Sequence, residues 1–246
     1  MTALRALWFW LSAGILAVYY SLTAVVAGLL GVPYRKGGVY DRAGRLWSTR
    51  VLQLNGIHVD VSGYENIPTG GPCVYISNHF SFADIWVLFS TLPDSLRFIS
   101  KQELFKIPLL GVAMRKARHI SIDRKNLVKA FTAYEEAAEA VRDGVSAVVF
   151  AEGTRSRNGQ LQAFKKGPFV LAIAAGVPIV PIWVGGTYEA FPPGALVFRR
   201  RPVEVRIGVP ISTAGMNYDD RDHLSREAHD AVVALSGRVD AADARD

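Results

Sequence analysis

The residues best suited to chemistry are a histidine and an aspartate five positions apart, His79 and Asp84. They stand between a predicted buried strand, residues 73–77, and a predicted apolar helix, residues 82–92. If His79 lies in the turn before the helix, the chain can fold its ring back against Asp84. The carboxylate would then accept a hydrogen bond from one ring nitrogen and leave the other nitrogen as a base for a substrate hydroxyl group.

A structural explanation of the same residues competes with this one. Ser81 followed by Asp84 three positions later fits a capping box, in which both side chains bond to backbone groups at the start of a helix. Under that interpretation Asp84 only caps the helix. We favour the chemical interpretation because the pair follows a strand, and sites in α/β proteins form where parallel strands end.

A second polar segment, residues 150–156, also follows a predicted strand. In this segment Gly153 allows close backbone approach to a ligand. Thr154 supplies a hydroxyl donor, and Arg155 can hold a phosphate group through two parallel hydrogen bonds. Taken alone, the segment would be a polar turn with a solvated arginine.

More cations stand at the ends of other predicted elements. Lys165 and Lys166 come just before a predicted helix, and helix N-termini attract anions. Lys101 and the segment 119–124 stand at strand ends, although we expect His119 itself to be structural. Each of these residues could be a solvated surface residue. Together they predict a basic cup for an anionic ligand beside the His/Asp pair.

The elements that must position these residues alternate along the chain. After residue 56, short runs rich in β-branched residues alternate with helical patterns, which predicts an α/β domain with a largely parallel or mixed sheet flanked by helices. The clearest helix covers residues 127–142, with Asn126 as its N-cap, and the last covers about 219–236. The predicted strands are 57–61, 73–77, 97–100, 119–122, 146–150, 179–184 and 203–207.

An uncharged segment rich in aromatic residues, residues 7–32, precedes this domain. As a helix it would be about 39 Å long, enough to cross a bilayer core of about 30 Å. A second, amphipathic helix, about residues 40–55, can lie in the membrane plane. A single span and a two-helix anchor on one leaflet are both compatible with this pattern, and a cleaved signal peptide is the less favoured alternative.

We therefore expect residues 1–55 to form a membrane anchor and residues 56–246 to form the catalytic domain. The basic residues after the apolar segment outnumber Arg5, which precedes it, and this places the catalytic domain in the cytoplasm. The inner membrane of a bacterium is the expected location.

Composition narrows the classes of function. The chain has 246 residues and a net charge of +6. It is 50% hydrophobic and 20% charged, which excludes a disordered protein, and its one cysteine, Cys73, excludes a disulfide scaffold. The positive charge favours anionic partners. Nucleic-acid binding is not expected, because the sequence has no basic helix with interleaved stacking aromatics and no recognition motif. It has neither H-E-x-x-H nor paired cysteines, so no metal is expected.

Four motifs, in order, resemble those of the glycerolipid acyltransferase family. The first, N-H-x-x-x-x-D, occupies residues 78–84, and the second resembles residues 119–124. The third, usually F-P-E-G-T-R-S, resembles residues 150–156, with alanine where proline is usual. The fourth, V-P-I-V-P, is at residues 177–181. The ordered set covers about residues 56–210.

This resemblance implies transfer of a fatty acyl group from acyl-CoA or acyl carrier protein to the sn-2 hydroxyl of lysophosphatidate, which gives phosphatidic acid. It also implies that His79 is the general base, that Asp84 orients it, and that no acyl-enzyme forms. No cofactor besides the acyl thioester is expected. The positions that the resemblance assigns to acceptor binding are Asn78, Lys101, Arg124, Glu152, Gly153, Thr154, Arg155, Lys166 and Gly167.

Other functions are compatible with the same residues. The same chemistry could act on another lysolipid, such as lyso-ornithine lipid, or on glycerol 3-phosphate. A catalytically inactive lipid-binding protein on the membrane is a third alternative, which the presence of both His79 and Asp84 disfavours. We expect acyl transfer to lysophosphatidate, with membrane lipids as partners and acyl carrier protein as a candidate partner.

Overall fold

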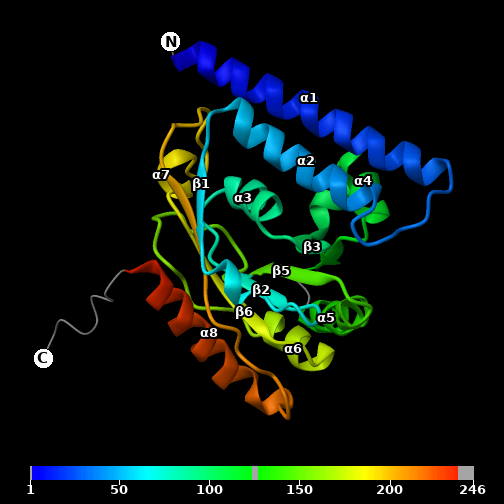
Figure 1. Ribbon diagram of the computed structural model, residues 1–246, viewed down its shortest axis with the longest axis vertical. Helices are drawn as coiled ribbons and strands as arrows, with labels where there is room; N and C mark the ends of the chain where they lie inside the picture. The colour runs from blue at the N-terminus through cyan, green and yellow to red at the C-terminus, as the bar shows by residue number, and fades with distance from the viewer. Residues whose placement is uncertain (1, 124–126, 238–246) are drawn as a thin grey trace, which may run out of the picture.

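A central sheet forms the middle layer of the computed structural model, which describes residues 2–123 and 127–237 (Figure 1). The strands in this part of the chain are β1 (Val59–Ser62), β2 (Val74–Ser77), β3 (Leu96–Lys101), β4 (Ile120–Ile122), β5 (Ser146–Phe150), β6 (Ile179–Gly185) and β7 (Val203–Ile207). They lie in the order β1-β7-β6-β2-β5-β3-β4. All neighbouring strands are parallel except β6 and β7, which confirms the expected largely parallel, mixed sheet.

Helices cover both faces of the sheet (Figure 1). They are α1 (Thr2–Leu29), α2 (Val39–Leu54), α3 (Ala83–Thr91), α4 (Leu110–Lys116), α5 (Leu127–Arg142), α6 (Gly167–Ala175), α7 (Thr187–Ala190) and α8 (Arg221–Ser236), with short 3-10 turns η1 (Tyr64–Asn66), η2 (Gln102–Lys106) and η3 (Tyr218–Asp220). Successive residues of β2 point to opposite faces. Val74 and Ile76 therefore pack with α5, α6 and α8, whereas Tyr75 packs in the cluster that includes α1, α2 and α3.

The predicted elements recur with small shifts. Strands β5 and β7 and helix α5 have the predicted bounds, and α2 and α8 begin and end within two residues of theirs. The expected N-cap of α5, Asn126, lies outside the described residues. The sequence pattern does not indicate α4 and α7, because helices of 7 and 4 residues are too short to show a helical period.

Helix α1 is buried on one side along its length and exposed on the other. Phe9, Ala13 and Ala24 lie on the buried side, which packs against α2 and α4. The ring of Phe9 also contacts Phe191 and Phe198, with centroids 5.0 and 5.6 Å away. By length and composition α1 could cross a membrane. The exposed large apolar residues of α1 are Leu4, Leu7, Trp8, Trp10, Leu11, Ile15, Val18, Tyr19, Leu22, Val26 and Leu29.

Helix α2 is fastened to the sheet by a buried ion pair. Arg97 of β3 is 1% exposed, and its guanidinium lies 2.9 Å from the carboxylate of Asp41 in α2. The same guanidinium lies over the ring of Tyr34, 4.5 Å from the ring centroid. A charge left alone in a protein interior is strongly destabilising, so this pair specifies where α2 sits on the sheet.

Candidate active site

The first and third predicted motifs meet at the carboxyl edge of the sheet, whereas the fourth, residues 177–181, lies at the amino end of β6. Strand β2 lies between β5 and β6, with Ser77 in register with Phe150 on one side and with Ile182 on the other. His79 lies two residues after the end of β2, and Glu152 lies two residues after the end of β5. The two segments therefore leave the sheet side by side. The crevice at this edge is where open α/β sheets bind ligands.

His79 and Asp84 are hydrogen-bonded, as their spacing predicts. Nδ1 of His79 lies 2.9 Å from Oδ2 of Asp84, whose side chain is fully buried, while 13% of the His79 side chain is exposed. The same carboxylate oxygen accepts the backbone N–H groups of Phe80 and Ser81 at 2.8 and 2.9 Å. In the tautomer that carries its proton on Nδ1, the ring presents Nε2 as a proton acceptor.

Asp84 also bonds to the turn that begins α3, so both interpretations of the sequence apply. It accepts the N–H of Ser81, and the Ser81 hydroxyl accepts the N–H of Ala83 at 3.0 Å. The arrangement differs from a standard capping box, because the N-cap position is Phe82 and the serine hydroxyl bonds only two residues ahead. One carboxylate thus orders the start of the helix and orients the imidazole.

Phe150 restrains the plane of the imidazole. The rings of His79 and Phe150 are stacked, with centroids 3.8 Å apart and an interplanar angle of 12°. Phe150 is the last residue of β5 and is buried. Sequence reasoning assigned no role to this side chain. Its place at a strand end could have indicated one, but only once β5 was known to lie beside β2.

Glu152 holds the backbone of the turn formed by residues 78–84, which we call the catalytic turn. Its Oε1 accepts the N–H of His79 at 2.6 Å, and its Oε2 accepts the N–H of Gln162 at 3.0 Å. The N–H of Ser156 donates to the carbonyl of His79 at 2.8 Å. Burial raises the pKa of Glu152 to about 7. Both the N–H and the carbonyl group of His79 are therefore hydrogen-bonded to the segment 150–156.

Asn78 joins the end of β2 to β6. Its Oδ1 accepts the N–H of Val184 at 2.7 Å, and its Nδ2 donates to the carbonyl of the same residue at 2.9 Å. Asn78 is fully buried, and Glu152 is nearly so. The polar atoms of both side chains bond to backbone groups, which indicates that they position His79 instead of making the direct substrate contact expected from the sequence.

Other expected binding residues are exposed near this edge. Thr154 and Arg155 face solvent, and Arg155 has no ion pair within the described residues. Gly153 has a φ of 76°, a conformation that favours glycine, and it turns the chain between Glu152 and these residues. Lys101 is the exposed last residue of β3. Arg124 lies outside the described residues, so its role stays a prediction.

Lys166 and Gly167 contact neighbouring helices. Nζ of Lys166 lies 2.7 Å from the carboxylate of Asp222 in α8, and the lysine side chain is 60% exposed. Exposed ion pairs contribute little to stability, so Lys166 can exchange this partner for another anion. A Cβ at Gly167 would lie 2.2 Å from the ring of Tyr134, so the glycine allows α5 to pack closely against the start of α6.

His119 is a hydrogen-bond acceptor within the fold. Its Nδ1 accepts the N–H of Phe98 at 3.1 Å. Desolvation, together with the positive charge of Arg97, lowers the pKa of His119 to about 3, so the ring is neutral at physiological pH. In the described part of the chain, no group of three or more His, Cys, Asp or Glu residues could hold a metal ion.

Comparison with known proteins assigns the class. Residues 58–185 match the family model described as Acyltransferase, and the chain belongs to this acyltransferase family. Several relatives bear the name 1-acyl-sn-glycerol-3-phosphate acyltransferase. The chloroplastic protein BAT2 from Brassica napus is 36% identical over 217 residues, which cover 85% of this chain and 61% of the relative. The human alpha enzyme is 36% identical over 192 residues, which cover 78% of this chain and 68% of the relative.

A solved structure has the same fold. The crystal structure of the 1-acyl-sn-glycerophosphate acyltransferase PlsC from Thermotoga maritima matches with a TM-score of 0.78 and 28% identity, over 97% of each chain. This likeness confirms the fold class expected from the sequence, and it includes the N-terminal helices. The chain spans less than two thirds of the Brassica relative, at 61% of its length.

The stability of the protein should fall as the pH rises through the range in which Glu152 ionises. Burial raises the pKa of Glu152 from 4.5 to about 7, so between these values the folded protein holds a proton that the unfolded chain has released. This contribution is complete below the lower value and lost above the higher one. We therefore expect the free energy of unfolding of the wild type, measured in urea, to decrease by on the order of 1–3 kcal/mol between these pH values when the change in the Glu152→Gln variant is subtracted.

The matched control is Glu65→Gln, because Glu65 is exposed. This variant should follow the wild type at every pH. If the wild type and Glu152→Gln kept a constant difference in unfolding free energy across the same pH range, the raised pKa of Glu152 would be contradicted.

Proposed function

We propose that this protein transfers a fatty acyl group from a thioester to the free sn-2 hydroxyl of 1-acyl-glycerol-3-phosphate. The observation that carries the proposal is the 2.9 Å contact between Nδ1 of His79 and Oδ2 of Asp84 at the carboxyl edge of the sheet, with the ring partly exposed. Relatives that are 36% identical and named for this acceptor support it. Acyl-CoA and acyl carrier protein are the two candidate donors.

In the proposed reaction His79 acts as the general base. Its Nε2 takes the proton of the acceptor hydroxyl while the hydroxyl oxygen bonds to the thioester carbonyl carbon. The carbonyl electrons move to oxygen and form a tetrahedral intermediate. The intermediate then collapses, the C–S bond breaks, and the imidazolium returns the proton to the departing thiolate. The buried carboxylate of Asp84 stabilises the imidazolium between these two steps.

The phosphate of the acceptor is assigned to Arg155, with Lys101 as a second cation. Arg155 follows β5, and Lys101 ends β3, the next strand of the sheet. Neighbouring strands lie about 4.8 Å apart, so side chains as long as these can reach one ligand. A planar guanidinium suits a phosphate group because it donates two parallel hydrogen bonds.

Removal of the base should abolish most of the activity. His79→Ala should lower kcat by about 10²–10⁴-fold, the usual contribution of a positioned general base. Asp84→Asn keeps an acceptor oxygen for the ring and for the two backbone N–H groups but removes the charge. It should lower kcat by about 10²–10³-fold, because the imidazolium loses its counter-charge. Both are measured as phosphatidic acid formed from lysophosphatidate with each donor, by mass spectrometry.

The matched control for these variants is His58→Ala, because His58 is exposed and lies outside the catalytic turn. It should retain wild-type activity, and all three variants should keep the wild-type circular dichroism spectrum. Wild-type turnover by a folded His79→Ala protein would remove His79 from the mechanism.

Arg155→Ala should raise the KM for lysophosphatidate by about 10–100-fold, because a charge-assisted bond to a phosphate group contributes about 1.5–3 kcal/mol. Monoacylglycerol and lyso-ornithine lipid have no phosphate, so their much slower transfer should not change. Arg226→Ala, which removes an exposed arginine from α8, is the control and should leave KM unchanged. Equal loss with all acceptors would show that Arg155 does not bind the phosphate.

We further propose that α1 lies on the cytoplasmic leaflet and does not cross the bilayer. Its buried side, from Phe9 to Ala27, packs on α2 and α4. A crossing helix would therefore carry the charged residues of α2 into hydrocarbon, which is unfavourable. Lying flat, α1 inserts its exposed apolar side, with Trp8 and Trp10 at the interface.

Single cysteines near the start of α1 and shortly after its end distinguish these orientations. Ala3→Cys and Val32→Cys are each made in a Cys73→Ala background, which otherwise has no cysteine. A membrane-impermeant maleimide should label both positions in inverted inner-membrane vesicles and neither in right-side-out vesicles. Labelling of the two positions from opposite sides would mean that α1 spans the membrane.

A further inference from the structure

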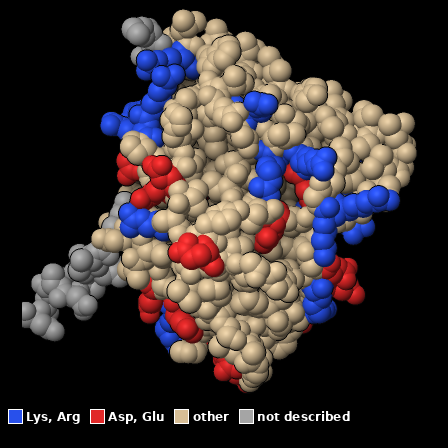
Figure 2. Space-filling view, viewed as in Figure 1, with Lys and Arg blue, Asp and Glu red and all other residues tan. Residues whose placement is uncertain are grey.

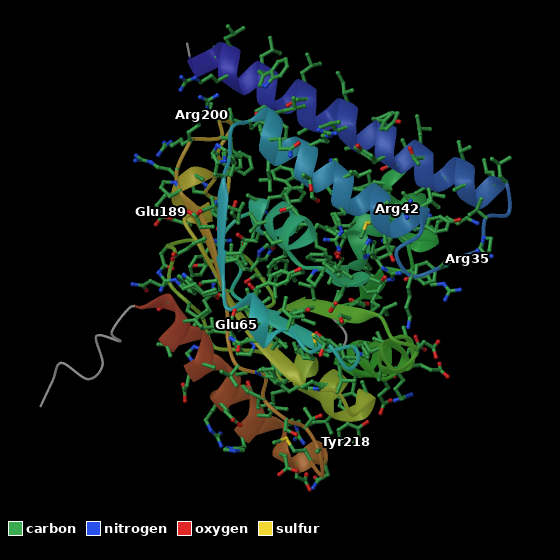
Figure 3. All side chains as sticks on the ribbon, in the orientation of Figure 1. Arg35, Arg42, Glu65, Glu189, Arg200 and Tyr218 are labelled. Carbon is green, nitrogen blue, oxygen red and sulfur yellow. The ribbon has the colours of Figure 1, made fainter. Side chains whose placement is uncertain are left out.

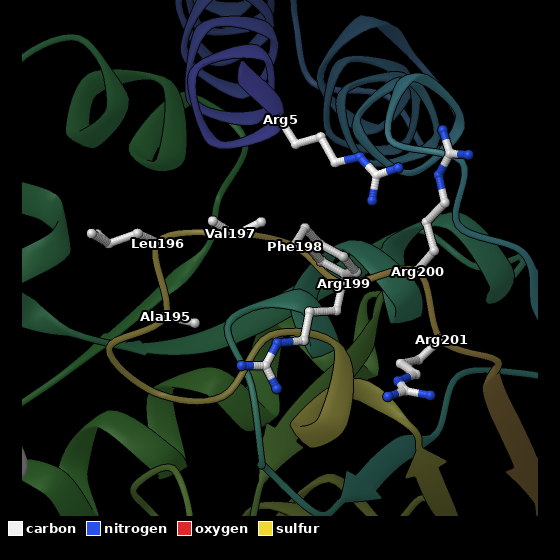
Figure 4. A pocket seen from close by; sticks show the side chains of 8 residues that line it. All are labelled: Arg5, Ala195, Leu196, Val197, Phe198, Arg199, Arg200 and Arg201. Atoms are coloured by element: carbon white, nitrogen blue, oxygen red, sulfur yellow. The ribbon is translucent and has the colours of Figure 1, made fainter. Parts of the chain in front are cut away.

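A groove lined by arginines lies beside the N-terminal end of α1. It has a volume of about 570 Å³ and is formed by Arg5 together with residues 195–201, which belong to the connection between α7 and β7 (Figure 4). We call it the arginine groove, after Arg5, Arg199, Arg200 and Arg201. None of the residues that form it belongs to the catalytic edge described above.

The four arginine side chains that line the groove are exposed, and none forms an ion pair with an Asp or Glu of residues 2–123 and 127–237. Figure 2 shows Lys and Arg side chains at this end of the molecule, with Asp and Glu side chains close below them. Because like charges repel, a cluster of this kind is stabilised when an anion enters it.

The packing of α1 on α2 brings two of these arginines together. Arg5 lies three residues before Trp8, whose Nε1 donates to the carbonyl of Leu54 at the end of α2. A Cβ on Gly56, just after α2, would lie 2.9 Å from Nε of Arg200. Arg5 and Arg200 therefore both approach the C-terminal end of α2, and Figure 4 shows their side chains extending toward the same space. The carbonyl groups of a helix C-terminus attract cations, which helps to hold these two near each other.

Apolar surface borders the arginine groove. Nε1 of Trp10 donates to the carbonyl of Leu196 at 2.9 Å, which ties the connection to α1. The side chain of Leu196 is 69% exposed and adjoins the exposed apolar side of α1, which includes Leu4 and Leu7. Cations beside an apolar surface are complementary to a phospholipid, whose phosphate meets the arginines while its acyl chains meet the leucines.

We propose that the arginine groove binds the phosphate headgroup of an anionic phospholipid of the bilayer, at a place separate from the acceptor site. The proposal goes beyond acyl transfer, since this lipid is a ligand and not a substrate, and it rests on the membrane attachment proposed above. A free phosphate ion would satisfy the arginines but would leave Leu196 and the apolar side of α1 uncovered. An acidic protein would also be attracted to the charge, but the bordering apolar surface of α1 favours a lipid.

The groove is connected to the catalytic turn. Phe191, at the start of the same connection, accepts a hydrogen bond from the hydroxyl of Ser81 at 2.6 Å. Ser81 in turn donates its N–H to Asp84. A headgroup held in the arginine groove therefore sets the position of the catalytic turn relative to the bilayer surface.

The test compares two double variants that remove the same charge. Arg199→Gln with Arg200→Gln takes two cations from the groove. Arg35→Gln with Arg42→Gln removes two exposed arginines near the other end of α2 (Figure 3). Binding of the purified protein is measured by flotation with vesicles of phosphatidylcholine, alone or mixed with phosphatidylglycerol. Thermal melting checks that both variants are folded.

We expect the groove variant to bind phosphatidylglycerol vesicles about 25-fold more weakly than the wild type, because each arginine near an anionic surface contributes about fivefold. Binding to phosphatidylcholine alone should be unchanged, and the Arg35/Arg42 variant should lose much less. Equal losses in the two variants would mean that the attraction is diffuse and would overturn the proposal. If the wild type bound neither kind of vesicle, the membrane attachment itself would be wrong.

Two further measurements identify the ligand. Calorimetric titration with inorganic phosphate should give no saturable binding. Saturable binding that the groove variant loses, with no preference for phosphatidylglycerol vesicles, would indicate a site for free phosphate and overturn the lipid assignment. The proposal would also be wrong if the groove variant kept its vesicle binding and lost only transfer from acyl carrier protein, because the groove would then be a protein-docking surface.

Discussion

The catalytic turn depends on one buried carboxylate oxygen. Oδ2 of Asp84 accepts the imidazole N–H of His79 and the backbone N–H groups of two residues between them. In a low-dielectric interior each of these bonds is stronger than in water, and an unpartnered carboxylate would be costly. The turn that satisfies the carboxylate is therefore also the turn that points the ring. The stacking of Phe150 and the backbone bonds of Glu152 restrain a geometry that Asp84 has already selected.

Features set by local sequence could be predicted. The strands Ser146–Phe150 and Val203–Ile207 have the expected bounds, because runs of β-branched and apolar residues between turn residues mark strands clearly. The contact between His79 and Asp84 was predictable for the same reason, since both residues belong to one turn and lie five positions apart. The expected parallel sheet followed from the alternation of strands and helices.

Contacts between distant segments could not be predicted. The bonds of Asn78 to Val184 join residues 106 positions apart, and the bond of Glu152 to His79 spans 73 positions. Both require the order of strands in the sheet, which spacing along one chain does not contain. The family resemblance assigned Asn78 and Glu152 to substrate binding, whereas in the structure their polar atoms bond to backbone groups. The arginine groove likewise could not be predicted from the sequence, because Arg5 reaches residues 195–201 only through the packing of α1.

The contacts of Phe9 have a consequence for the order of events during synthesis. Phe9 packs on Phe191 and Phe198, about 180 residues later in the chain. A ribosome that adds about 5–20 residues per second needs on the order of 10–40 s to supply them. Throughout that interval α1 lacks part of its protein partner, so its apolar residues are available to a lipid surface. The newly made polypeptide is therefore suited to associate with lipid before its α/β domain is complete.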